Sequence, residues 1–207
     1  MLVGDEGDKK LSRIQLRNRK RILEAALDVF SQHGYRGTTL DEISAAAGLS
    51  KPNILYYFEG KEDIHLSLLN GLMDTWLEPL VTLDPNGEPL AEVLAYVKRK
   101  LEMTRDYPRE SRLFAGEILQ GAPRMGPHLE RSLQKLFDEK CAVIQSWMDA
   151  GRLNQVDPRH LIFSIWATTQ HYADFEAQVD LLLHQDPRTH AQADLYLSTL
   201  FTRLLRP

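Results

Sequence analysis

The sequence has 207 residues, of which 43% are hydrophobic and 8% aromatic, and this composition excludes an intrinsically disordered chain. No apolar run reaches about 20 residues and no signal-peptide pattern opens the chain, so we expect a soluble, cytoplasmic protein with no membrane segment. The formal net charge of −4 excludes a uniformly basic protein, and the single cysteine, Cys141, excludes an intramolecular disulfide. Cys141 lies in a helical pattern and is expected to be a small buried residue.

Helical periodicity runs through the chain, and no strand pattern or internal repeat interrupts it. We therefore predict an all-α fold with three parts. Residues 1–12 form a disordered arm, residues 13–60 a three-helix DNA-binding domain with a helix-turn-helix, and residues 61–207 a helical ligand-binding and dimerisation domain. Outside the helix-turn-helix, the predicted helices cover residues 14–33, 61–83, 90–106, 109–119, 127–150, 158–175 and 189–205.

Two short helices separated by a glycine follow the first predicted helix. Thr39 and Glu42 form a capping box at the start of the first short helix, whose buried face we assign to Ile43, Ala46 and Ala47. Gly48 stands where the helix needs a left-handed C-cap, which is a conformation that glycine adopts without strain. Next, Ser50 can cap the second short helix, with Pro52 in its first turn. This pattern predicts a helix-turn-helix, and hence DNA binding.

The charge is distributed unevenly along the chain. Between Lys9 and Lys61 there are ten basic and five acidic residues, so the negative excess lies in the remainder of the chain. Because salt limits the reach of phosphate attraction to about 8–10 Å, a local basic surface is sufficient for DNA binding.

Side chains of the helix-turn-helix should divide between bases and phosphates. We assign Lys51 and Asn53, at the start of the second short helix beside Pro52, to base edges. The remaining candidates for DNA contact, mainly with phosphates, are Arg17, Arg36, Thr38, Thr39, Tyr56, Tyr57 and Lys61. Tyr56 has packing against the preceding helix as an equal alternative. Ile54, Leu55 and Phe58 are expected to be core.

The helix-turn-helix resembles the DNA-binding domain of the tetracycline-repressor (TetR) family of bacterial regulators. The resemblance rests on Thr39, Ile43-Ser44, Ala47-Gly48-Leu49-Ser50, Tyr56-Tyr57-Phe58 and Lys61-Glu62. It departs from the usual family pattern at Pro52-Asn53-Ile54-Leu55, which falls on the base-reading face. The resemblance implies a repressor that a small molecule releases from operator DNA.

Motifs in the C-terminal part are similar to those of the pyrimidine-utilisation regulators within this family. They include Arg105-Asp106-Tyr107-Pro108, Gly121-Ala122-Pro123 and the segment from Ile165-Trp166-Ala167 to Thr169-Gln170-His171-Tyr172. This resemblance implies uracil or thymine as the effector and the control of pyrimidine utilisation as the role.

A pocket for a small flat ring should combine aromatic walls with a side chain that both donates and accepts hydrogen bonds. Trp166 and Gln170 lie one helical turn apart on the same face, and Gln170 suits the imide edge of uracil. Trp76 and Phe114 would add walls, and Glu117 or Tyr172 a further hydrogen bond. Core packing of the aromatics and an interface role for Gln170 are the alternatives.

The sequence does not predict an enzyme, a cofactor or a metal site. His171 and Asp174 share a helical face, but Glu176 points elsewhere, and no nucleophile or phosphate-loop motif is present. Because one helix-turn-helix reads too few base pairs, we expect a homodimer. Its four-helix interface would use Phe163, Ala167 and Thr168 with Leu195, Leu200 and Leu204.

Two alternatives remain open. A multidrug-type regulator of the same fold would use a larger and greasier cavity. A DNA-binding protein of this fold could instead be controlled by a protein partner and show no small-molecule response.

Overall fold

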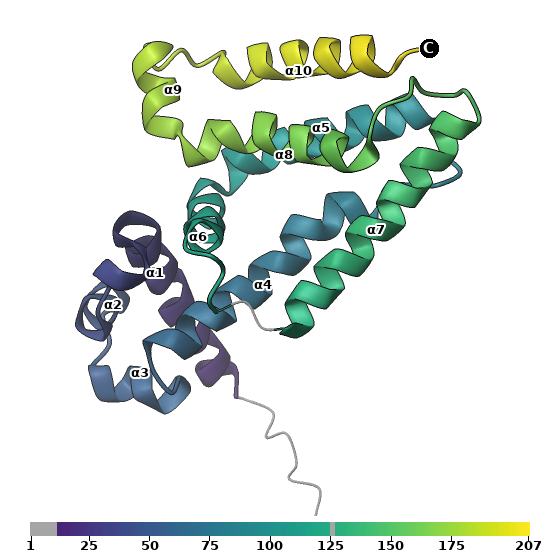
Figure 1. The fold of residues 1–207 in the computed structure, drawn as a ribbon. Coiled ribbons are helices and arrows are strands. Elements are labelled where there is room, and N and C mark those ends of the chain that lie inside the picture. Colours follow the sequence, from purple (N-terminus) through teal and green to yellow (C-terminus); the bar gives the residue numbers. More distant parts are fainter. Residues whose placement is uncertain (1–11, 125–126) are drawn as a thin grey trace, which may run out of the picture. The chain divides into compact units, whose positions relative to one another are not determined.

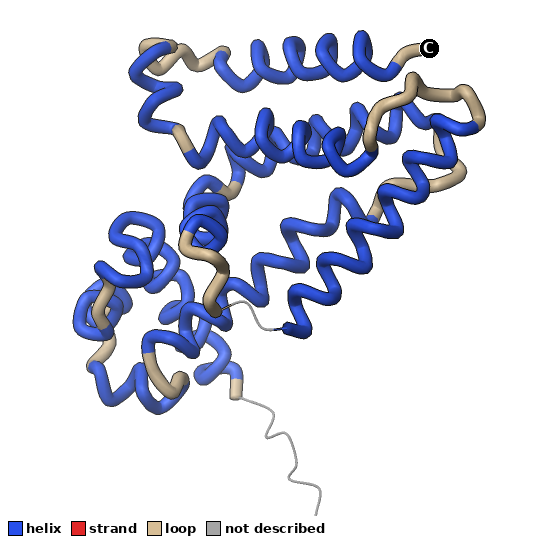
Figure 2. Tube along the Cα trace, viewed as in Figure 1, coloured by secondary structure: helices blue, strands red, loops and turns tan. Residues whose placement is uncertain are grey.

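A computed structural model describes residues 12–124 and 127–207, and all regular structure in these ranges is helical (Figure 2). The predicted N-terminal arm lies outside the described residues, apart from Ser12. The chain divides into two compact units, Met1–Leu68 and Leu69–Pro207, which are treated one at a time below.

The first unit consists of α1 (Arg13–Gly37), α2 (Leu40–Ala47), α3 (Lys51–Tyr57) and the first two turns of α4 (Lys61–Val81) (Figure 1). Ser12 opens α1 with a capping box to Gln15. The last turn of α1 follows a break at Gly34, where φ is 66° and ψ is 172°. This break explains why the periodicity predicts a helix that ends at residue 33.

The turn between α2 and α3 depends on Gly48. Its φ of 58° is left-handed, and its N–H donates to the carbonyls of Ser44 and Ala45. The N–H of Leu49 also donates to the Ser44 carbonyl, so the last carbonyls of α2 are satisfied. The predicted capping box of Thr39 with Glu42 and the predicted cap by Ser50 are both confirmed.

The core of the first unit is formed by apolar side chains from all four helices, namely Ile22, Ala26, Phe30, Ile43, Ile54, Phe58 and Ile64. Two predictions about this core are wrong. Ala46 is exposed, and the buried position on α2 belongs to Ser44, whose hydroxyl donates to the Asp41 carbonyl at 2.8 Å. Leu55 is 46% exposed, because Ile54 and Phe58, one turn apart, already supply the buried face of α3.

The second unit contains the rest of α4 and six further helices. These are α5 (Pro89–Asp106), α6 (Pro108–Leu119), α7 (Pro127–Asp149), α8 (Pro158–Asp174), α9 (Glu176–Leu182) and α10 (Thr189–Leu205). The predicted helices correspond to α5–α8 and α10, and Asp157 caps α8 by accepting from Arg159 N. The short helix α9 is not among the predicted elements.

α5 is the centre of the second unit, since it packs against both α8 and α10 (Figure 1). Its buried stripe includes Val93, Tyr96, Val97, Lys100 and Leu101, and Leu161, Ile165, Leu197 and Phe201 cover it. One member of this stripe, Lys100, is a charged residue.

Polar contacts join α6 to the α8–α9 corner. Ser111 Oγ donates to Asp174 at 2.5 Å, and Arg112 Nη1 donates to Glu176 at 2.6 Å.

On α7, Cys141 is half-buried, and burial raises the pKa of its thiol, which makes it a poor nucleophile. None of the helices that the structure describes is long and apolar enough to cross a membrane.

Candidate DNA-binding and effector sites

The exposed start of α3 carries the residues that the sequence assigns to base edges. Lys51, Pro52 and Asn53 are all exposed. Lys51 Nζ lies 3.1 Å from a carboxylate oxygen of Asp41, and this ion pair is exposed on both sides, so it contributes little stability and can yield to another partner.

Two adjacent tyrosines at the end of α3 are tied to α1. Gln15 Nε2 donates to Tyr56 Oη at 2.8 Å, and Asn18 Nδ2 donates to Tyr57 Oη at 3.0 Å. Because both hydroxyls accept these bonds, their own protons point elsewhere and can be donated to a phosphate. Tyr56 is 69% exposed, so its alternative assignment to packing is not favoured.

Two of the predicted phosphate contacts have partners inside the protein. Thr38 is buried, and its hydroxyl donates to the Gly34 carbonyl at 2.8 Å, so its side chain cannot reach a phosphate. Lys61 Nζ donates to the carbonyls of Tyr35 and Thr38 at 2.9 and 2.7 Å. This ammonium gives hydrogen-bond donors to carbonyls at the end of α1 and so holds the start of α4 against it.

The other predicted DNA contacts are exposed. Arg17 and Arg36 lie at the surface, and Thr39 is exposed although its hydroxyl is used in the capping box. Leu55 is an exposed residue of α3 that the sequence reasoning placed in the core. An apolar side chain there can contact a thymine methyl group.

A small cavity lies inside the second unit, with a volume of about 50 Å³. It is lined by Met73, Trp76 and Leu77 of α4, Tyr96 and Lys100 of α5, Phe114 of α6, Leu133 of α7, and Trp166 and Gln170 of α8. Pockets for drug-sized ligands have volumes of about 300–1,000 Å³, and a cavity that holds benzene has about 150 Å³, so this cavity would have to widen to hold a single ring.

The structure brings four of the six predicted ligand residues to this cavity and leaves two away from it. Trp76, Phe114, Trp166 and Gln170 line it. Glu117 is buried, but its carboxylate accepts from Arg124 N at 2.7 Å and Arg124 Nη1 at 2.8 Å, and so holds the turn after α6. Tyr172 packs beside the core, with its ring centroid 6.1 Å from that of His190. The assignments of Glu117 and Tyr172 to the cavity are therefore corrected.

Lys100 and Tyr96 line the cavity but are absent from the sequence-based assignment. The signal that could have found them is the apolar stripe of α5, in which Lys100 occupies a position that periodicity reserves for the core.

Lys100 is the unusual residue of this cavity. It is 2% exposed, and its Nζ lies 4.7 Å from the centroid of the Trp76 ring. Burial lowers the pKa of Lys100 to about 7, and the nearby Asp174 carboxylate opposes that shift. Burial raises the pKa of Asp174, although Ser111 donates to it. Lys100 therefore changes charge near neutral pH.

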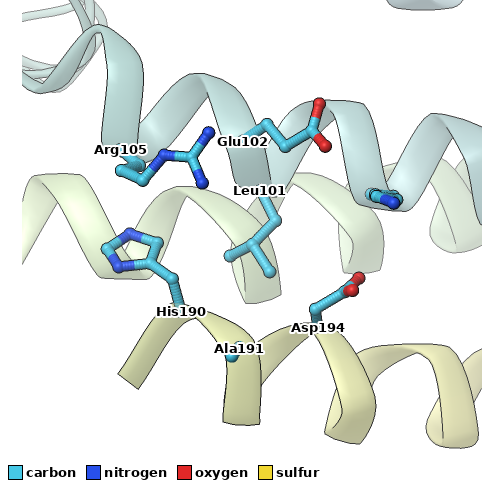
Figure 3. A pocket seen from close by; sticks show the side chains of 7 residues that line it. Leu101, Glu102, Arg105, His190, Ala191 and Asp194 are labelled. Carbon is cyan, nitrogen blue, oxygen red and sulfur yellow. The ribbon is translucent and has the colours of Figure 1, made fainter. Parts of the chain in front are cut away.

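Other depressions lie on the surface of the second unit. A groove of about 400 Å³ shares Phe114 and Gln170 with the cavity and continues over Ile118, Leu119 and Phe175. Between α5 and α10, a second hollow of about 310 Å³ is lined by side chains of both charges, including Arg105, Glu102, His190 and Asp194 (Figure 3). The second hollow contains none of the predicted ligand residues. Among the described residues, no group of three His, Cys, Asp or Glu is placed to hold a metal ion.

An exposed helix-turn-helix in one unit and a small cavity with aromatic walls in the other define a ligand-responsive DNA-binding regulator. Residues 22–68 match the family model described as "Bacterial regulatory proteins, tetR family", and residues 69–206 match "YcdC-like protein, C-terminal region". The chain belongs to the TetR family of transcriptional regulators.

Individual relatives agree with this assignment. The chain is 49% identical over 171 residues to the HTH-type transcriptional regulator RutR of Escherichia coli (strain K12), which covers 83% of this chain and 81% of RutR. Two solved structures share the fold at 22% identity. They are the putative regulator SCO4942 from Streptomyces coelicolor, with a TM-score of 0.70 over 92% of this chain and 99% of that one, and AibR in complex with isovaleryl coenzyme A and operator DNA, with a TM-score of 0.62 over 75% and 85%.

We predict that Lys100→Met stabilises the ligand-free protein at pH 7. Replacing buried ionic groups by apolar ones of similar volume is often neutral or stabilising by about 1–4 kcal/mol. For a chain of this size, each kcal/mol raises Tm by about 2–4 °C. Thermal unfolding of the wild type and the variant measures the difference.

The pH dependence of this difference has a defined sign. The pKa of Lys100 falls from 10.5 to about 7 on folding, so between these values the folded state binds fewer protons and the wild type gains stability as pH rises. The gain in stability from Lys100→Met should therefore reach its largest value below pH 7 and be smaller at pH 9. A variant that is less stable than wild type, or an advantage that does not change with pH, would contradict the buried-ammonium assignment.

Proposed function

We propose that uracil or thymine binds the cavity of the second unit and releases this repressor from its operator, which controls pyrimidine utilisation. The observation that carries the proposal is the lining of the small cavity, which places two indoles and the amide of Gln170 on its walls. The side chain of Gln170 makes no hydrogen bond to the residues that the structure describes. The 49% identity to RutR and the resemblance to pyrimidine-utilisation regulators support the same effector class.

The chemistry of the cavity suits a pyrimidine imide. Trp76, Phe114 and Trp166 offer aromatic surface to a flat ring, and stacking of this kind favours planar ligands. The Gln170 amide has one acceptor and two donor hydrogens, so it can pair with an N–H and an adjacent carbonyl together.

For DNA, we propose that Lys51 and Asn53 contact base edges, with Pro52 and Leu55 beside them on the exposed face of α3. We assign contacts with the phosphate backbone of the DNA to Arg17, Arg36, Thr39, Tyr56 and Tyr57. The protein would act in the cytoplasm, where operator DNA lies, as a regulator and not as an enzyme.

We further propose a homodimer through α8 and α10. Phe163 and Ala167 of α8 are exposed, as are Leu195, Leu200 and Leu204 of α10. Large apolar side chains that gather on two helices mark an interface more often than a solvated surface. A two-fold dimer would present two copies of α3 to two half-sites.

The proposed route from effector to DNA is α4. Its first two turns belong to the helix-turn-helix unit, where Lys61 is bonded to the end of α1 and Arg19 Nη2 donates to Ser67 Oγ at 3.2 Å. Its later turns carry Trp76 to the cavity. A ligand that displaces Trp76 would therefore act on a helix that is bonded directly to the DNA-binding unit.

The groove beside the cavity is the feature that would suit a bulkier effector. Its lining by Phe114, Ile118, Leu119 and Phe175 is apolar, as the multidrug-type alternative requires. That alternative predicts a thermal shift with bulky cations and none with pyrimidines, whereas control by a protein partner predicts no shift with either.

Asn53→Ala should weaken binding to the specific operator by about 10–100-fold, because a bidentate base contact is worth about 1–3 kcal/mol. Affinity for unrelated duplexes should change little. Arg36→Ala is the matched contrast: it should weaken both kinds of binding and reduce the salt slope by about 1. Fluorescence anisotropy at several salt concentrations, with a duplex recovered by selection on this protein, measures both effects. Equal losses on specific and unrelated duplexes for Asn53→Ala would remove it from the base-reading set.

Uracil or thymine should raise the Tm of the wild type by roughly 5–10 °C at 100 times Kd, since binding to the folded state alone adds about 2.7 kcal/mol. Gln170→Ala should abolish this shift. Tyr172→Phe serves as the control and should retain it, because Tyr172 lies off the cavity. If no pyrimidine at millimolar concentration shifts the wild-type Tm, the proposed effector is wrong.

A further inference from the structure

The inner wall of the cavity presents hydrogen-bond donors that have no acceptor in the protein. The ammonium of Lys100 is buried and lies against the Trp76 ring, yet it makes no hydrogen bond to any described residue. The carboxylate that faces it from α8 is Asp174, which accepts from Ser111 Oγ at 2.5 Å. A lysine ammonium carries three donor hydrogens, and leaving them unsatisfied in a buried site is costly.

Tyr96 adds a second donor. Trp166 Nε1 donates to Tyr96 Oη at 2.6 Å, so the hydroxyl oxygen is an acceptor there and its own proton is left for another partner. Burial raises the pKa of Tyr96, which keeps that proton in place at neutral pH. The indole Nε1 of Trp76 is likewise buried without a hydrogen-bond partner.

Gln170 is the one lining residue whose side chain supplies a strong acceptor as well as donors. A ring bound here must therefore present carbonyl acceptors to Lys100 and Tyr96. Uracil and thymine carry two carbonyl oxygens with one N–H between them, and a second N–H at N1. Cytosine replaces one of these carbonyls by an amino group, which would direct its donors at Lys100 or Tyr96.

We propose that Lys100 is the specificity-determining residue of the effector site: its ammonium donates to a ring carbonyl and so selects pyrimidines with two carbonyls over aminopyrimidines. This inference rests on the proposed function and assigns the selectivity of that same cavity to one side chain. A site whose buried donors are satisfied only by the correct ligand rejects the wrong one strongly, because the wrong ligand leaves those donors unpaired.

The test is calorimetric titration of uracil and cytosine into the full-length wild type, Lys100→Met and Lys98→Met. Methionine keeps an unbranched side chain, one atom shorter than that of lysine, and removes its donors. Lys98 lies on the same helix, is exposed, and is absent from the cavity lining, so Lys98→Met is the matched control. Circular dichroism and operator binding verify that each variant is folded.

The wild type should prefer uracil over cytosine by at least about 100-fold. Lys100→Met should lose about 10–100-fold in affinity for uracil and little for cytosine, because a hydrogen bond from a charged donor is worth about 1.5–3 kcal/mol. The preference then shrinks by the same factor, while Lys98→Met keeps the wild-type ratio.

A second readout separates direct donation from a merely structural role. The groups near Lys100 are the uncharged Trp76 ring on α4, Tyr96 one turn earlier on α5, and Asp174 on α8. A carbonyl ligand favours the charged ammonium, whose pKa is about 7 in the empty site, so affinity for uracil should fall about tenfold between pH 6 and pH 8. Lys100→Met should show no such fall.

The two hypotheses fail in different ways. If uracil binds the wild type and Lys100→Met keeps both the preference and the pH dependence, Lys100 does not determine specificity, and the proposed function stands. If neither uracil nor thymine binds the wild type, the proposed function fails, and the inference that rests on it fails too.

Discussion

A lysine ammonium buried beside an indole ring is the interaction on which the proposed effector site depends. Lys100 occupies a core position of α5, the helix that α8 and α10 cover, and it lies 4.7 Å from the centroid of Trp76. Trp76 Nε1 is buried without a hydrogen-bond partner. Lys100 is 2% exposed and makes no side-chain hydrogen bond to the described residues. Buried polar groups without partners lower stability, and proteins retain them mainly where function requires them. A ring with hydrogen-bond acceptors, bound in this cavity, would thus give partners to the donors that folding leaves without them.

The helix that carries Trp76 also explains how such a ring could affect DNA binding. The first turns of α4 are bonded to the helix-turn-helix unit through Lys61 and Ser67, and its later turns reach the cavity. If effector and operator favour slightly different positions of this one helix, binding at one site changes the affinity at the other. The two hydrogen bonds of Lys61 to the end of α1 give this helix a fixed point in the DNA-binding unit.

The sequence predicts the helix-turn-helix well because its signals are local. Thr39, Gly48 and Ser50 act on neighbouring backbone groups, so their roles follow from spacing alone. The roles of Thr38 and Lys61 could not be predicted in this way, since both depend on the end of α1. In the cavity, Trp166 and Gln170 share a helical face, whereas Glu117 is diverted by Arg124 across a turn. Lys100 shows the limit most clearly, because periodicity marks its position as core but says nothing of which ring it faces.

The central claim is that effector and operator compete through one conformational equilibrium, and calorimetric titration of uracil into free and operator-bound protein tests it most directly. Coupling between two sites is reciprocal, so bound operator should weaken uracil binding by the factor by which uracil weakens operator binding, about 5–150-fold. Such a loss of affinity in the DNA complex would support the account. Equal affinities in the two titrations would contradict it.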